Sequence, residues 1–385
     1  MPGHHALLSP SAAHRWMNCT AAPRLEADAP DSESSYALEG TLAHAFCARK
    51  LKKHLGLSTA AEDAEIAELS PRFYSGEMDE YTDAYATAVI ERLQAARTMT
   101  PDARLLVETR LDFSEYVPES FGTSDATIIA DGLMEVIDFK YGKGVRVEAV
   151  HNEQMMIYAL GAFLRHSLEY GIRRVRMTIV QPRIDNLSEY EISVADLLRW
   201  ADEELRPKAR EAFDGTGAQR PGEWCRFCRV KGACKALAGK CVDTARAMSD
   251  PALLTPEDMA RDVLPWLSTV KSWVASIEEY TLQQALSGVA YSGYKVVEGR
   301  SVRRISDENA VADILHDQGY DDSEFMKPSQ LCGITELERL VGKKRFTQLC
   351  GDYVTKPQGK PTLVEAGDKR PAYNTAADDF GGVEV

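Results

Sequence analysis

The chain has 385 residues, a length that predicts two or three domains rather than one small module. Hydrophobic residues make up 44% of the sequence and charged residues 27%, which excludes general disorder, collagen-like repetition and a continuous coiled coil. Taken alone, the formal net charge of −14 argues against a partner rich in phosphate, because repulsion would slow the encounter. The distribution of charge along the chain has to decide that question.

Helical patterns come first along the chain. Residues 36–57 carry apolar side chains at helical spacing, with Gly56 as the expected end of the helix. Residues 60–97 are acidic and also helical in pattern, whereas residues 104–112 change to the composition of a strand. This change from a helical pattern to a strand pattern predicts the start of a sheet.

A β-hairpin is predicted next, over residues 124–140. Two β-rich runs flank an Asp-Gly pair, which is a strong signal for a two-residue turn. With that pair as the turn, Ala130 is paired with Leu133, and the same register places Asp125 opposite Asp138.

The hairpin is followed by an amphipathic helix over 148–168 and a strand over 174–181. The resulting order of two strands, a helix and a strand predicts an α/β fold with a mixed sheet flanked by helices. Beyond a cysteine-rich segment, residues 255–287 are helical in pattern, and residues 294–350 predict a small α+β region with a strand at 294–299. Helices are expected there near 307–318 and 334–349. The expected domains are the core, a helical connector, a small C-terminal domain and a flexible tail: residues 1–245, 246–290, 291–355 and 356–385.

The hairpin brings acidic side chains together. Directly opposed residues have Cβ atoms roughly 5 Å apart, and like charges there are destabilising unless a cation holds them. Mg²⁺ or Mn²⁺ accepts carboxylate oxygens from neighbouring strands. Lys140 shares a sheet face with Asp138 because side chains alternate along a strand. With Glu108 on the preceding strand, the set suits metal-assisted phosphodiester hydrolysis. The alternative is a surface hairpin with solvated acids, which the apolar residues around Asp138 and the opposed Asp125 disfavour.

Three further side chains are candidates for the same site. His44, in the first predicted helix, can bind Mn²⁺, although a single helical histidine is more often structural. Gln154 and Tyr158 are one helical turn apart, so both can face one site.

The cysteines predict a second metal centre. Cys225, Cys228 and Cys234 form a Cys-x2-Cys-x5-Cys array, which is typical of zinc or of an iron–sulfur cluster. The fourth ligand can be Cys241 or the distant Cys19, and spacing decides neither this choice nor the metal. The other cysteines are interpreted as ordinary buried thiols: Cys47, Cys332 and Cys350.

In this order the motifs resemble the RecB-like branch of the PD-(D/E)XK nucleases. The resemblance covers roughly residues 5–240 and is greatest to the iron–sulfur members, which include the AddB nuclease domain and the CRISPR-associated RecB-like exonucleases. It implies a restriction-endonuclease-like core, a Cys-ligated cluster and a small α+β C-terminal extension. Asp138 stands where Glu is commoner in the family.

The resemblance also implies roles for individual residues. The catalytic set would be Glu108, Asp125, Asp138, Lys140, Gln154 and Tyr158. The ligands of the catalytic Mg²⁺ or Mn²⁺ would be His44, Asp125, Asp138 and the backbone carbonyl of Phe139. The ligands of a [4Fe–4S] cluster, with Zn²⁺ as the alternative metal, would be Cys19, Cys225, Cys228 and Cys234.

Local charge is compatible with DNA as the partner. Residues 140–183 contain eight basic side chains and three acidic ones, and residues 220–240 contain six and one, so each segment carries +5. Both segments flank the expected metal site, as phosphate binding requires. The alternative is that these charges pair with acidic segments. The expected DNA contacts are Lys143, Arg146, Arg173, Arg174, Arg176, Arg226 and Arg229.

The sequence therefore predicts a Mg²⁺- or Mn²⁺-dependent DNA exonuclease that acts on DNA ends or single strands. The opening and closing segments resemble an uncharacterised phage-encoded family, which implies phage recombination or replication in a bacterial host, with a phage single-strand-binding or annealing protein as a partner and oligomers allowed. The chain contains no apolar run of signal-peptide or membrane-spanning length, so a cytoplasmic protein is expected. The competing hypothesis is a Cys-stapled DNA-binding or replication-scaffold protein with an inactive nuclease site.

Overall fold

The computed structural model describes residues 6–29, 35–168, 170–247 and 255–286, together with residues 289, 291, 292 and 344. The chain divides into the units Met1–Asp321 and Asp322–Val385, and all the elements named below belong to the first unit. In the part of the chain that the structure describes, no helix combines the length and apolarity needed to span a membrane. The strand expected at 294–299, the helices near 307–318 and 334–349 and the tail lie outside the described residues, apart from Lys344.

A five-stranded mixed sheet forms the centre of the fold, in the order β1-β2-β3-β4-β5. The β3–β4 pair is parallel and the other neighbouring pairs are antiparallel. The strands are β1 Arg104–Asp112, β2 Phe121–Ala130, β3 Leu133–Phe139, β4 Arg174–Gln181 and β5 Asn186–Ser193. The predicted mixed sheet is confirmed. Strand β5 was not predicted, because an edge strand can be largely polar and lacks a continuous apolar run.

The β2–β3 hairpin has the predicted register. Pairing runs from Ala130 with Leu133 to Ala126 with Ile137, and Gly132 occupies the turn with φ of 78°. This left-handed conformation favours glycine. The ladder ends one pair before Asp125 and Asp138, so the side chains of these two residues are placed by other contacts.

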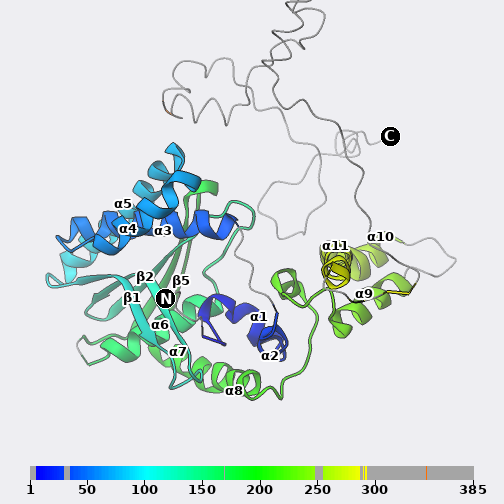
Figure 1. Cartoon of the computed structure of the whole chain (residues 1–385). Helices are drawn as coiled ribbons and strands as arrows, with labels where there is room; N and C mark the ends of the chain where they lie inside the picture. Colours follow the sequence, from blue (N-terminus) through cyan, green and yellow to red (C-terminus); the bar gives the residue numbers. More distant parts are fainter. Residues whose placement is uncertain are drawn as a thin grey trace, which may run out of the picture. The chain divides into compact units, whose positions relative to one another are not determined.

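Helices cover both faces of the sheet (Figure 1). One face packs against α3 Ser35–His54 and α5 Gly76–Met99, and α4 Ala60–Phe73 packs on α3. The other face packs against α6 Glu153–His166. Because successive side chains of β3 point to opposite faces, Ile137 joins the first core and Val136 the second.

Two predicted helices have different bounds in the structure. The helical pattern of 60–97 is split between α4 and α5, because Tyr74 and Ser75 adopt extended conformations. The helix expected over 148–168 begins at Glu153. Asn152 precedes it in an extended conformation, and its side chain accepts a hydrogen bond from Met155 N at 3.1 Å. A side-chain cap of this kind sets the start of a helix.

Shorter elements lie before and after these layers. Before the sheet they are η1 Pro10–Ala12, α1 Ala13–Asn18 and α2 Ala22–Glu26. After β4 they are η2 Pro182–Ile184, α7 Val194–Trp200, η3 Ala201–Leu205, α8 Arg206–Asp214, η4 Glu223–Phe227, α9 Lys235–Ala247, α10 Pro256–Asp258, η5 Met259–Val263 and α11 Leu264–Leu286. The helical pattern predicted for 255–287 is therefore confirmed.

Close packing between α6 and the sheet yields a first test. A Cβ on Gly161 would overlap Cε1 of Phe113, whose side chain is fully buried. We expect Gly161→Ala to lower the free energy of unfolding by about 1–3 kcal/mol, because the core must shift to admit the methyl group. The matched control is Gly40→Ala in α3, where no described atom lies within 4 Å of the new Cβ. It should raise stability by about 0.5–1 kcal/mol. Urea denaturation measures both, and equal effects would contradict the packing argument.

Candidate functional site

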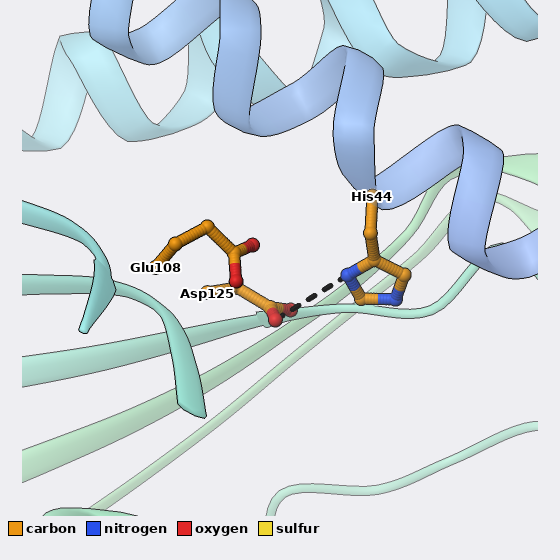
Figure 2. Close-up of side chains that lie close together, drawn as sticks. All are labelled: His44, Glu108 and Asp125. Carbon is orange, nitrogen blue, oxygen red and sulfur yellow. Dashed lines mark ion pairs between the residues drawn. The ribbon is translucent and has the colours of Figure 1, made fainter. Parts of the chain in front are cut away.

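Three ionisable side chains from separate elements converge beside the sheet (Figure 2). His44 comes from α3, Glu108 from β1 and Asp125 from β2. One ligand atom of each lies within 4.8 Å of the others, and His44 Nδ1 is 3.3 Å from Asp125 Oδ1. Within the described residues this is the single set of three or more His, Cys, Asp or Glu side chains that meets this distance. Together with Asp138 and Lys140, we call it the carboxylate site.

The second half of the carboxylate site is a hydrogen-bonded triangle. Lys140 Nζ is 3.0 Å from Asp138 Oδ2 and donates to Gln154 Oε1 at 3.1 Å. Gln154 Nε2 donates to Asp138 Oδ1 at 3.3 Å. Gln154 lies in the first turn of α6, so this helix fixes the relation between the lysine and the aspartate. Tyr158 lies one turn later on α6, close enough for Gln154 to influence the pKa of its hydroxyl group, which burial raises.

Asp125 connects the two halves through the backbone of β3. Its Oδ2 accepts a hydrogen bond of 2.7 Å from Phe139 N, beyond the last ladder pair of β2 and β3. The Asp125 side chain therefore replaces the strand partner that Phe139 would otherwise need. From the sequence, Asp125 and Asp138 were expected to face each other as a ladder pair of the hairpin. In the structure that pair is absent from the ladder, and Asp125 instead contacts the residue after Asp138.

Glu108 has a left-handed backbone conformation, with φ of 48°. The neighbouring pairs Val107 with Ala126 and Thr109 with Ser124 form the β1–β2 ladder, whereas Glu108 and Asp125 between them do not pair. Such a conformation costs a non-glycine residue about 1–3 kcal/mol and persists only where its surroundings enforce it. Strain of this kind is concentrated at functional sites.

Burial and mutual repulsion shape the ionisation of the site. Burial raises the pKa of Glu108 to about 8, and the Asp125 carboxylate adds to this effect. Burial opposes the charged form of His44, but the Asp125 carboxylate outweighs it and raises the pKa to about 9. Burial also raises the pKa of Asp138, whereas for Asp125 the His44 charge overcomes burial and lowers the pKa. For Lys140, Asp138 overcomes burial and raises the pKa.

These residues fit a divalent cation. Carboxylate oxygens and an imidazole nitrogen are suitable ligands for Mn²⁺, and carboxylates suit Mg²⁺. Asp138 Oδ2 is buried and faces Lys140 Nζ at 3.0 Å, so a cation bound at this oxygen would share the carboxylate with the lysine.

Four of the six described cysteines line one pocket, which we call the thiol pocket. They are Cys19, directly after α1, Cys225 of η4, Cys228 and Cys234. The other candidate from sequence, Cys241, does not line the pocket but lies directly behind it, in an apolar cluster with the pocket residues Cys225 and Leu237. All the described cysteines are free thiols.

The thiol pocket has features of a metal centre. Arg220 N donates to Cys19 Sγ and Gly222 N to Cys225 Sγ, both at 3.4 Å. Burial and the Glu26 carboxylate raise the pKa of Cys228 to about 12, so the thiol keeps its proton at neutral pH unless a metal ion displaces it. Tetrahedral Zn–S bonds of about 2.3 Å place sulfurs about 3.8 Å apart. No three described thiols lie within 4.8 Å of one another, so the spacing exceeds that of a formed zinc site.

The basic residues predicted to contact DNA fall into three places. Lys143 and Arg146 lie in the segment after Lys140, where Arg146 pairs with Glu148. Arg226 and Arg229 flank Cys228 of the thiol pocket.

The third group lies far along the sheet from Asp138. Arg173 immediately precedes β4, and Arg174 and Arg176 lie at its start, opposite Leu133 and Glu135. Arg174 and Arg176 both pair with Glu191 of β5. At roughly 3.3 Å per strand residue, this group is separated from the carboxylate site by several residues of β3.

Two side chains near the site were not predicted from the sequence. Lys52 and Glu62 form an ion pair at 2.5 Å, and the charges of both influence the pKa of Glu108. Lys52 could have been predicted from the sequence, because it follows His44 by about two turns of the same helix and so lies on the same helix face. Glu62 comes from α4, so only the packing of α4 on α3 reveals it.

A surface cavity lies apart from both sites. Its lining includes Arg110, Phe121, Gly161 and Arg165 and none of the residues of the carboxylate site or the thiol pocket.

The fold and the site thus define a mixed α/β protein with an ionisable cluster beside a five-stranded sheet. The chain belongs to the family described as "Protein of unknown function (DUF2800)", which matches residues 5–371.

The chain is also distantly similar to solved structures. The protein SSO0001 has 14% sequence identity and a TM-score of 0.22, with 58% of this chain and 96% of that chain covered. A protein of Eubacterium rectale named "Putative exonuclease" has 10% identity and a TM-score of 0.31, with 66% of this chain and 92% of that chain covered.

The pKa values of His44 and Glu108 predict how stability depends on pH. Folding raises the pKa of His44 from 6.5 to about 9 and that of Glu108 from 4.5 to about 8. Both groups bind protons more tightly in the folded state, so stability falls as pH rises. Without added divalent metal, the free energy of unfolding should decrease between pH 6.5 and 9.

Urea denaturation at several pH values measures this dependence. The variant His44→Asn/Glu108→Gln should show a smaller decrease over the same range, because neither replacement titrates there. An equal slope in the variant and the unchanged protein would contradict the assignment.

Proposed function

We propose that this protein is a Mg²⁺- or Mn²⁺-dependent deoxyribonuclease that hydrolyses phosphodiester bonds at DNA ends or in single strands. The observation that carries the proposal is the convergence of His44, Glu108 and Asp125 within 4.8 Å, next to the Asp138–Lys140–Gln154 triangle. A hard-metal site beside a held ammonium group is the combination that phosphodiester hydrolysis requires.

His44, Asp125, Asp138 and the Phe139 carbonyl would hold the cation, together with Glu108, which converges with His44 and Asp125 more closely than Asp138 does. When bound, Mg²⁺ or Mn²⁺ would supply Lewis acidity for the attack of water on phosphorus. The Asp125 hydrogen bond to Phe139 N holds β3 at this point and keeps the Phe139 carbonyl in a defined orientation.

Lys140 supplies positive charge next to the cation site. Asp138 and Gln154 hold its ammonium group, and its side chain is 27% exposed, so it can still reach a phosphate. A preorganised donor of this type stabilises the charge that develops on phosphate oxygens. Gln154 fixes the Lys140 and Asp138 side chains relative to each other, and Tyr158 would restrict the Gln154 side chain from the next turn of α6.

The thiol pocket is proposed to hold a [4Fe–4S] cluster through Cys19, Cys225, Cys228 and Cys234, with Zn²⁺ as the alternative. Each iron of such a cluster takes a separate thiolate, so the ligand sulfurs are farther apart than around one zinc ion. The wide spacing of the thiols and the two N–H···S contacts favour the cluster. Its role would be to hold residues before the sheet and residues after it together.

DNA would approach along the segment after Lys140 and the segment around Cys228, whose basic residues are Lys143, Arg146, Arg226 and Arg229. Phe227 between them is 66% exposed, and an exposed aromatic ring can stack on an unpaired base. Arg174 and Arg176 would contribute less, because both are held in ion pairs with Glu191. Action in phage recombination or replication in the bacterial cytoplasm, with a phage single-strand-binding or annealing protein, is part of the proposal.

The second candidate function is a cysteine-stapled DNA-binding or scaffold protein without nuclease activity. The complete set of Asp125, Asp138 and Lys140 favours the nuclease, because a binding protein has no need for strained and repelling carboxylates.

The first prediction of this proposal concerns Lys140 and Asp138. Lys140→Ala or Asp138→Ala should lower the rate of Mn²⁺-dependent DNA cleavage by about 10²–10³-fold or more, because each removes charge from the reacting centre. Cleavage of 5′- and 3′-labelled linear, circular and single-stranded DNA measures the effect. Lys208→Ala is the matched control, since Lys208 lies on α8 and pairs only with Glu204 among the described acids.

Full cleavage by the Asp138→Ala/Lys140→Ala variant would overturn the nuclease assignment. DNA binding by the unchanged protein with no metal-dependent product would support the scaffold function instead.

The second prediction concerns the metal in the thiol pocket. Protein purified without oxygen should be brown, with absorbance near ~410 nm and bound iron, as thiolate-ligated iron–sulfur clusters are. Cys19→Ser should lose the iron, whereas the matched variant Cys241→Ser should retain it, because Cys241 does not line the pocket. Colourless protein with stoichiometric zinc would contradict the cluster.

A further inference from the structure

Helix α1 is only six residues long, but it contacts the thiol pocket and the first turn of α6, which carries Gln154. At its end it leads directly into Cys19 of the thiol pocket. On its exposed side, His14 Nδ1 donates to Glu153 Oε2 at 3.2 Å, and Asn18 Nδ2 is 3.4 Å from Glu153 Oε1. Glu153 immediately precedes Gln154, the residue that contacts both Asp138 and Lys140.

Glu153 is fixed more firmly than a typical surface acid. Its side chain is 22% exposed and receives hydrogen bonds from two residues of α1. As the first residue of α6, it also places a negative charge at the positive end of the helix dipole. Burial opposes its charge, yet the His14 hydrogen bond and its own backbone N–H lower its pKa. The Glu153 carboxylate therefore ties the first turn of α6 to α1.

The other side of α1 is tied to the thiol pocket. Arg15 Nε donates to Glu26 Oε2 at 2.9 Å, and Arg15 Nη1 donates to the carbonyl of Phe227 at 3.2 Å. The buried Glu26 also accepts from Arg229 N at 2.7 Å. These bonds hold the segment that carries Cys228 against α1 and α2. The exposed side of α1 is thus bonded, directly and through Glu26, to the segment that carries Cys228.

We propose that Glu153, held by His14 and Asn18, is a positioning residue that couples the thiol pocket to the carboxylate site through α1. The pocket fixes Cys19 and Arg15, α1 fixes the Glu153 carboxylate, and Glu153 fixes Gln154 against Asp138 and Lys140. The metal affinity of the carboxylate site then depends on the order of the thiol pocket. This inference rests on the function proposed above, and its test separates the two.

The contact between His14 and Glu223 provides a matched control. His14 Nε2 is 3.6 Å from Glu223 Oε1, and the Glu223 side chain is 83% exposed. An ion pair this exposed contributes little. Glu223 is the exposed first residue of η4 and is not adjacent to Gln154, so its removal should leave the carboxylate site unchanged.

The test measures Mn²⁺ binding by isothermal calorimetry and amide hydrogen exchange of residues 155–158, both without DNA. Glu153→Ala should weaken Mn²⁺ binding by about 10-fold, as loss of a residue that orients a metal-site partner does. It should also accelerate exchange at the start of α6. Glu153→Gln, which still accepts a bond from Asn18, should lie between Glu153→Ala and the unchanged protein. Glu223→Ala should change neither quantity.

A double-mutant cycle tests the route. His14→Ala/Glu153→Ala should bind Mn²⁺ no more weakly than Glu153→Ala, because residues on one path have non-additive effects. Cys19→Ser should weaken binding in the unchanged protein but not in the Glu153→Ala background. Additive losses, or unchanged Mn²⁺ binding and exchange in Glu153→Ala, would overturn the coupling.

If Cys19→Ser does not fold, the His14–Glu153 cycle decides alone. If the unchanged protein binds Mn²⁺ with these dependences but does not cleave DNA, the coupling stands and the nuclease function fails. If the unchanged protein cleaves DNA and the Glu153→Ala variant has unchanged Mn²⁺ binding and amide exchange, the nuclease function stands and the coupling fails. If the unchanged protein binds no Mn²⁺, the coupling is tested by amide exchange alone: Glu153→Ala must accelerate the exchange of residues 155–158, or the coupling fails.

Discussion

Repulsion between buried carboxylates is the constraint on which the rest of this structure depends. Glu108, Asp125 and Asp138 approach one another where water is scarce, an arrangement that is unfavourable unless each negative charge is compensated. Asp125 has His44 and the Phe139 N–H, whereas Asp138 has Lys140 and Gln154. Glu108, with no cation in direct contact among the described residues, has a pKa raised to about 8 by burial and by Asp125.

This compensation explains why helices are needed on both sides of the sheet. His44 reaches the site from α3 on one face, and Gln154 reaches it from α6 on the other. The β2–β3 ladder has to end before Asp125 for that carboxylate to reach Phe139 N. The left-handed Glu108 interrupts the β1–β2 ladder at the same level. The site therefore lies where regular strand pairing stops, since a complete ladder would fix these side chains by the pleat alone.

Local chemistry made part of this arrangement predictable from the sequence. The Asp-Gly turn determined the hairpin register, and the alternation of side chains placed Lys140 with Asp138. The left-handed backbone of Glu108 and the contact of Asp125 with Phe139 N depend on packing between distant segments, which no local pattern encodes. The same holds for Cys19: three thiols of the pocket form a motif, whereas the fourth joins them only through the placement of α1.

The shortness of α1 determines what kind of coupling it can transmit. A six-residue helix has no stability of its own in water, so its position is set by its contacts. Trp16 and Met17 are buried in the core that α6 also joins, which prevents α1 from moving as a rigid lever. On its exposed side, His14 and Asn18 are bonded to Glu153, His14 also lies beside Glu223 and Trp224, and Arg15 is bonded to the thiol-pocket segment. A change at the pocket is therefore transmitted as loss of order at Asn18 and His14, rather than as a displacement of β3. Because Gln154 contacts both Asp138 and Lys140, disorder in its turn of α6 is enough to weaken the carboxylate site.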